Sequence, residues 1–192
     1  MHVAMMLYAG FRLLEVAGPM DVFHEANRLY GRTFYEQHLV GPCPGAVVCS
    51  NGTSVGTTDC LLDMHTAFDI VVVPGSPVIA TGLEQRELVD WLSAMGRKGR
   101  RLVSVSNGAF FLARSGLADH RCLTTHRNDA HRLATEYPLV QVMSNLSYLK
   151  DGNLYSSGGV SDAIRLALGL VREDLGEGLA ENIRNTLLRP RN

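Results

Sequence analysis

The segment RLVSVSNGAFFLARSG (residues 101–116) changes from a strand pattern to a helix pattern within three residues. Its first five residues are mostly apolar or β-branched, as in a buried strand, and the run AFFLAR that follows has helical spacing. Ser106, Asn107 and Gly108 lie between the two patterns. A sharp turn of this kind lifts one side chain above the carboxyl end of a sheet and directs backbone N–H groups toward whatever binds there. In this chain the raised residue is Ser106.

Strand and helix patterns alternate on both sides of this turn. The run DIVVVPG (residues 69–75) has the continuous Val/Ile composition of a central strand that is buried on both faces of a parallel sheet. Other strands are predicted at residues 2–8, 34–40 and 139–142, and helices at 19–31, 84–98, 128–137 and 177–188, with a long helix after Gly159. The sequence therefore predicts an α/β fold: a doubly wound, mainly parallel sheet between helices, forming one domain over residues 1–192.

Two hairpins are also predicted. In the segment AVVCSNGTSVGTT (residues 46–58), Asn51-Gly52 lies between two β-rich arms. This dipeptide favours a type I′ turn, because both central residues of that turn need a positive φ. The second hairpin is expected around Asp151-Gly152.

Composition limits the classes of function. The formal net charge of −1 gives no basic surface for a phosphate backbone, so this segment alone is not expected to bind DNA. No apolar run is long enough to span a membrane and no signal peptide is recognised, which predicts a cytoplasmic protein. No cofactor or metal is expected, since the cysteines lack the spacing of metal ligands and are interpreted as reduced thiols; they are Cys43, Cys49, Cys60 and Cys122.

Polar residues follow several of the predicted strands, at the edge of the sheet where ligands bind in such folds. They are Glu15, Gly75, Ser76, Ser106, Asn107 and His126. Each alone has a structural explanation, as a helix-entry acid, a turn, a helix cap or a surface histidine. Their shared position favours one binding site, in a single cavity at the carboxyl end of the sheet.

Several segments, in the same order, resemble the ThiJ/PfpI group of the class I glutamine amidotransferase-like superfamily. Within that group the chain is most similar to the N-terminal domain of AraC-type transcription regulators. The matching segments are YAGFRLLEVAGPMDVF (8–23), DIVVVPGSP (69–77), SVSNGAFFLARSGLADHRCLTTH (104–126) and GNLYSSGGVSDAIRLALGLVREDLG (152–176).

The resemblance assigns roles to the candidate residues. It places the family's acid at Glu15, its histidine at His126, and its backbone N–H donors at Gly75 and Asn107. The elbow residue, which is a nucleophilic cysteine in the enzymes of the group, is Ser106 here. A serine hydroxyl needs an adjacent, oriented base, whereas a cysteine is partly thiolate by itself. The substitution therefore favours a sensor over a thiol enzyme.

As a member of the regulator branch, the chain would be a homodimeric sensor of a small polar metabolite. DNA would then be bound by a helix-turn-helix domain expected beyond Asn192. An amino-acid-like or betaine-like ligand would suit the site, because Glu15 can face an ammonium group and the elbow amides a carboxylate. The alternative is a small hydrolase or hydratase that uses Ser106 or a bound water, with Glu15 and His126 as acid and base. A dimerisation module without a ligand is the third possibility.

Overall fold

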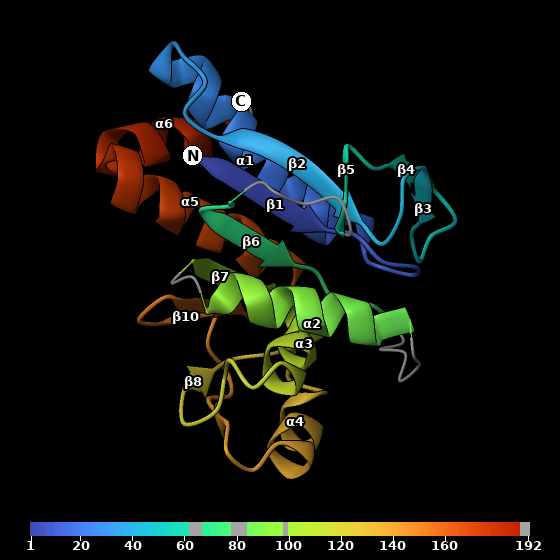
Figure 1. Cartoon of the computed structure of the whole chain (residues 1–192). Helices are drawn as coiled ribbons and strands as arrows, with labels where there is room; N and C mark the ends of the chain where they lie inside the picture. The colour runs from blue at the N-terminus through green and yellow to red at the C-terminus, as the bar shows by residue number, and fades with distance from the viewer. Residues whose placement is uncertain (62–66, 78–83, 98–99, 189–192) are drawn as a thin grey trace.

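The computed structural model describes residues 1–61, 67–77, 84–97 and 100–188, and a seven-stranded sheet is at the centre of this part of the chain (Figure 1). The strand order is β10-β11-β7-β6-β1-β2-β5, and all neighbours are parallel except β10 and β11. The strands are β1 (His2–Met6), β2 (Glu36–Gly41), β5 (Asp59–Cys60), β6 (Ile70–Val73), β7 (Arg101–Val105), β10 (Tyr148–Asp151) and β11 (Leu154–Ser157). The Val/Ile run forms β6, which is fully buried in the middle of the sheet, as predicted.

Helices cover both faces of the sheet. They are α1 (Leu13–Tyr30), α2 (Glu84–Gly96), α3 (Ala109–Arg114), α4 (Ala130–Glu136), α5 (Val160–Leu175) and α6 (Glu177–Leu188). Helices α1, α5 and α6 pack against one another on one side, and α2 packs beside α3 on the other (Figure 1). The predicted doubly wound α/β fold is confirmed. No described helix is both long enough and apolar enough to cross a bilayer.

Helix α1 begins six residues before the predicted start at Pro19, so that prediction is wrong. Proline lacks an N–H and therefore gives up one hydrogen bond inside the helix. Packing of α1 against α5 offsets this loss: a Cβ at Gly18 would lie only 2.9 Å from Cγ1 of Ile164, so the glycine lets the two helices come close. The earlier start places Glu15 in the first turn of the helix.

The predicted hairpin at residues 46–58 forms a separate two-stranded sheet of β3 (Ala46–Val48) and β4 (Ser54–Gly56). Its turn differs from the prediction, because five residues connect the strands and only Gly52 of the Asn51-Gly52 pair has a positive φ. The side-chain oxygen of Asn51 accepts a hydrogen bond of 3.0 Å from the N–H of Thr53, which stabilises this longer loop instead of a type I′ turn.

Two short parallel strands, β8 (Cys122–Leu123) and β9 (Gln141–Val142), form a second two-stranded sheet beside α4. The second predicted hairpin is confirmed as β10 and β11, which turn at Gly152 with a φ of 59°. The predicted end of the helix over 84–98 lies outside the described residues. All four cysteines are free thiols, and two of them, Cys49 and Cys60, are buried.

Candidate functional site

The elbow between β7 and α3 is a strained backbone turn. A 3-10 helix, Ser106–Gly108, follows β7 directly, and Ser106 has a φ of +53°, which residues other than glycine rarely adopt. A Cβ at Gly108 would lie 2.3 Å from the backbone oxygen of Val73, so only glycine allows the turn to approach β6 this closely. The predicted position of Ser106, between a strand and a helix at the centre of the sheet, is confirmed.

Glu15 is a buried carboxyl group beside this elbow. Its side chain is 1% exposed, and its Oε2 accepts a hydrogen bond of 2.6 Å from the N–H of Gly75. Burial raises the pKa of Glu15 from its ordinary value of 4.5 to about 7, although the Gly75 hydrogen bond and the Arg12 guanidinium act in the opposite direction. Both the ionised and the protonated form are therefore populated near neutral pH.

Asn107 joins the elbow to the loop that follows β6. Its side-chain Oδ1 accepts a hydrogen bond of 2.9 Å from the N–H of Ser76, and its Nδ2 donates one of 2.7 Å to the carbonyl of the same residue. A Cβ at Gly75 would lie 2.3 Å from Oδ1 of Asn107 and 3.0 Å from Oε2 of Glu15. Four of the six predicted residues, Glu15, Gly75, Ser76 and Asn107, are thus in direct contact.

The hydrogen bonds of this group join its members to one another and to the carbonyl of Gly10. The N–H groups of Gly75 and Ser76 donate to Glu15 and Asn107, and the Ser76 hydroxyl donates to the carbonyl of Gly10 at 2.8 Å. In this structure, Gly75 and Ser76 therefore hold the other residues in position.

Ser106 is 4% exposed, and within the described part of the chain its hydroxyl has no histidine or carboxylate at hydrogen-bond distance. Its carbonyl oxygen accepts a hydrogen bond of 2.8 Å from the Thr125 hydroxyl, which ties the elbow to the loop carrying His126. The Nδ1 of His126 accepts the N–H of Asn128 at 3.3 Å. The structure therefore brings His126 near the elbow through Thr125, and gives it a local backbone partner.

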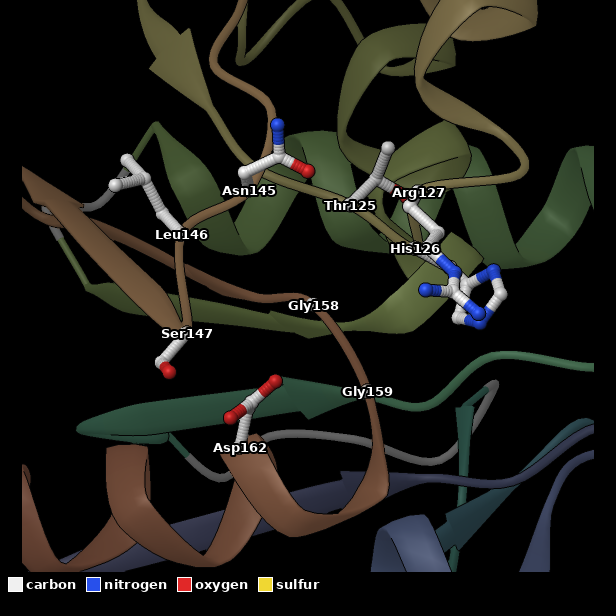
Figure 2. Close-up of a pocket in the computed structure, with 9 residues that line it drawn as sticks. All are labelled: Thr125, His126, Arg127, Asn145, Leu146, Ser147, Gly158, Gly159 and Asp162. Carbon is white, nitrogen blue, oxygen red and sulfur yellow. The ribbon is translucent and has the colours of Figure 1, made fainter.

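His126 lines a cavity of about 350 Å³ (Figure 2). Thr125, whose hydroxyl donates to the Ser106 carbonyl, is part of the same lining. The described lining is Thr125, His126, Arg127, Asn145, Leu146, Ser147, Gly158, Gly159 and Asp162. The other five predicted residues are not in this described lining. That all six share one cavity stays a prediction.

Two charged residues of the cavity were missed by sequence reasoning. Asp162 comes from the first turn of α5, across from the loop that carries Arg127 (Figure 2). Asn145, an uncharged residue of the same lining, has a positive φ of 62°. A signal was present for Asp162, since it follows Gly158-Gly159 at a predicted helix start, where an acid is common. Arg127 carries no such signal besides its place next to His126.

The protein is similar to bacterial regulators and also to an enzyme. It is 30% identical over 181 residues to the HTH-type transcriptional regulator GbdR of Pseudomonas aeruginosa, a match that covers 94% of this chain and 48% of GbdR. It is 26% identical over 181 residues to the isonitrile hydratase of Pseudomonas putida, covering 94% of this chain and 75% of the enzyme.

A solved AraC family transcriptional regulator from Pseudomonas putida has the same fold, with a TM-score of 0.84 and 27% identity, covering 97% of this chain and 98% of that chain. The chain spans about half the length of GbdR. A sequence model of the DJ-1/PfpI family matches residues 1–173, which confirms the resemblance inferred from the motifs. The chain belongs to the DJ-1/PfpI family.

Proposed function

We propose that this chain is the ligand-sensing and dimerisation domain of a cytoplasmic AraC-type transcription regulator. In this proposal a separate helix-turn-helix domain binds the DNA. The similarity to GbdR supports the proposal, because the match covers 48% of that regulator and leaves room in it for a further domain. The formal net charge of −1 also supports it, because a DNA-binding surface would need an excess of basic residues.

The observation that carries the sensor proposal over an enzyme is the environment of Ser106. A serine nucleophile needs a base within hydrogen-bond reach, and no described histidine or carboxylate lies there. Glu15 accepts from Gly75, and His126 accepts from the N–H of Asn128. This environment supports a binding role for the elbow in the proposal.

The ligand in this proposal is a small zwitterion, amino-acid-like or betaine-like. A cavity of about 350 Å³ is of the size that holds small molecules, about 300–1,000 Å³. Arg127 offers a guanidinium that suits a carboxylate, and Asp162 offers a carboxylate that suits an ammonium group. Glu15, Ser106 and Asn107 would complete the site from the elbow side. Gly75 and Ser76 would keep Glu15 and Asn107 in place.

Calorimetry on variants tests this assignment. Glycine betaine, carnitine and the free amino acids are first screened by thermal shift, and each hit is titrated into wild type, Glu15→Gln and Arg127→Gln. Removing one partner of a desolvated charged hydrogen bond costs about 2–5 kcal/mol, so Glu15→Gln should bind at least tenfold more weakly. Arg127→Gln should also bind more weakly, by a smaller factor because Arg127 is exposed. Arg28→Gln is the control, because Arg28 pairs with Glu25 at the far end of α1. Equal binding by all four proteins would exclude Glu15 and Arg127 as contacts.

The enzyme alternative has one observation in its favour: a carboxyl group whose pKa is about 7 suits general acid–base chemistry. The similarity to isonitrile hydratase makes the hydration of an isonitrile the first reaction to assay. Turnover by wild type that Ser106→Ala or Glu15→Gln abolishes would overturn the sensor proposal.

The homodimer rests on exposed apolar side chains. Leu14 at the start of α1 is 58% exposed, and Val48 on the β3–β4 hairpin is 51% exposed. In the proposed homodimer a partner copy would bury these side chains. Light scattering at tens of micromolar protein should give the mass of a dimer. A dimer with a dissociation constant of roughly one micromolar or less persists at that concentration. A monomer at that concentration would contradict the prediction.

A further inference from the structure

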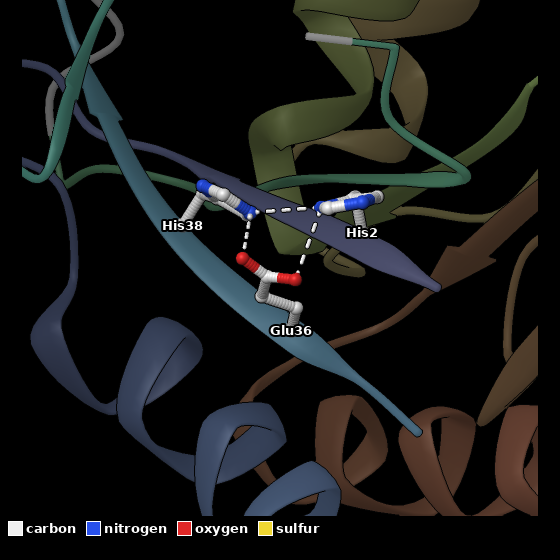
Figure 3. Close-up of side chains that lie close together, drawn as sticks. All are labelled: His2, Glu36 and His38. Carbon is white, nitrogen blue, oxygen red and sulfur yellow. Dashed lines mark hydrogen bonds and ion pairs between the residues drawn. The ribbon is translucent and has the colours of Figure 1, made fainter. Parts of the chain in front are cut away.

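A second cluster of chemically active side chains lies at the amino ends of β1 and β2, away from the elbow. It consists of His2, Glu36 and His38 (Figure 3). The strands are parallel, with His2 opposite Glu36 and Ala4 opposite His38. Since side chains alternate between the two faces of a strand, this register puts all three on one face of the sheet. The elbow follows the carboxyl end of the parallel strand β7, so the two sites are at opposite ends of the sheet.

The donor atoms of the cluster converge on one point. Nδ1 of His2 lies 3.1 Å from Nε2 of His38, and both nitrogens lie near the carboxylate of Glu36, at 3.6 Å from Oε2 and 3.8 Å from Oε1 respectively. Two imidazole nitrogens on a tetrahedral zinc ion lie about 3.3 Å apart, given Zn–N bonds of about 2.0–2.1 Å. The nitrogen separation is thus close to what a shared ion requires.

A further carboxylate orients His38. Oδ2 of Asp59 lies 3.0 Å from Nδ1 of His38, and the hydroxyl of Thr58 donates to the same oxygen at 2.7 Å. The ring of Phe68 packs edge-on against the imidazole, with 5.3 Å between ring centroids. A proton on Nδ1 that is donated to Asp59 leaves the lone pair of Nε2 directed at the cluster. Histidines that bind metals are commonly held by a carboxylate in this way.

A hydrogen bond between the two imidazoles also explains their separation, but it leaves Glu36 without a role. The Glu36 oxygens are too far from either ring for a hydrogen bond, at 3.6 and 3.8 Å. A cation between the three groups would engage all of them at once. Two imidazoles and one carboxylate are a donor set that suits zinc, copper, nickel or iron.

We propose that His2, Glu36 and His38 bind a divalent transition-metal cation such as Zn²⁺, with Asp59 as the residue that positions His38. The side chains of His2 and Glu36 are 42% and 60% exposed, so an ion reaches them from solvent. The ion joins two neighbouring strands of the folded sheet. It therefore stabilises the folded chain by mass action, independently of any ligand at the elbow.

Zinc titration of the untagged, metal-free chain tests the proposal, since a polyhistidine tag would itself bind zinc. Competition with a fluorescent zinc indicator should show one equivalent bound by wild type. His2→Ala and Glu36→Gln, at partly exposed positions, should each weaken binding at least tenfold, and Asp59→Asn about 10- to 100-fold. His131→Ala removes an exposed histidine on α4 and should bind as wild type does.

The variants leave all four cysteines in place, so zinc bound by thiols would persist equally in every protein. Wild-type affinity in both His2→Ala and Glu36→Gln would overturn the proposal. So would the absence of binding by wild type at about 0.1 mM free zinc, a concentration at which a site of even modest affinity is mostly filled. A zinc-dependent rise in the melting temperature of wild type, absent in His2→Ala, would show that the ion binds the folded sheet.

Discussion

The buried carboxyl group of Glu15 makes the stability of the protein depend on pH in an unusual direction. Its pKa is about 7 in the folded state, against an ordinary value of 4.5 in an unfolded chain. Between these two values the folded protein binds more protons than the unfolded chain, so the free energy of unfolding falls as the pH rises. The stability that the raised pKa of Glu15 gives the folded state is fully present below pH 4.5 and is lost as the pH rises through 7. A shift of one pKa unit corresponds to about 1.4 kcal/mol, so the shift of Glu15 changes the free energy of unfolding by about 3 kcal/mol.

Glu15→Gln should remove this dependence. Glutamine has nearly the same shape, stays neutral at every pH, and its side-chain oxygen can still accept the N–H of Gly75. The wild type must hold an ionised carboxylate in a buried position at pH 8, and the variant need not. Relative to wild type, we expect the variant to gain about 2–3 kcal/mol in free energy of unfolding between pH 5 and pH 8.

Urea unfolding at pH 5, 6, 7 and 8 measures this difference. All other titratable groups are common to both proteins and cancel in the comparison. Glu25→Gln is the matched control on α1: hydrogen bonds from Arg28 hold the pKa of Glu25 below its ordinary value, so Glu25 is ionised throughout this range. If the stabilities of wild type and Glu15→Gln run parallel from pH 5 to pH 8, Glu15 is not desolvated as the structure indicates.

Three further predictions concern the scaffold. Ser106→Gly should be about 1 kcal/mol more stable than Ser106→Ala, because glycine adopts the left-handed φ of the elbow without strain, at some cost in chain entropy; equal stabilities would contradict the strain. Gly108→Ala should lose about 2–3 kcal/mol through its clash with the backbone of β6, whereas Gly56→Ala, with open space around it, should change stability by less than about 0.5 kcal/mol in the same thermal melts. Tyr35→Phe should cost about 1 kcal/mol in urea unfolding, because it removes a 2.8 Å hydrogen bond to Asp174; an unchanged midpoint would show that the bond adds nothing.

The fold could be predicted where a segment carries a strong pattern of its own. The Val/Ile run of β6 and the elbow after β7 are local signals, and both are confirmed. The start of α1 could not be predicted from local rules, because packing against α5 outweighs the preference of Pro19 for a first turn. The predicted turn type of the β3–β4 hairpin is also wrong, because a side-chain hydrogen bond stabilises a longer loop.

The candidate residues could be named from the sequence, but their contacts could not. Gly75 donates to Glu15 across 60 residues and Ser76 to Asn107 across 31, and no local pattern encodes such pairs. The histidine cluster shows the same limit. Glu36 and His38 are two residues apart and would share a face of any strand, which is a usable signal. That His2 joins them depends on the register between β1 and β2.

The two hydrogen bonds between the Asn107 side chain and the main chain of Ser76 affect which substitutions this site can accept in evolution or in design. Asn107 holds the main chain of Ser76, through one N–H and one carbonyl, and not its side chain. Replacing the serine by another small residue leaves both of these bonds available. Position 107 is far less tolerant: aspartate has no donor for the carbonyl, and glutamine is one methylene too long. Substitution should therefore be better tolerated at 76, where only the hydroxyl's hydrogen bond to the Gly10 carbonyl is lost, than at 107, whose amide joins the elbow to the loop after β6.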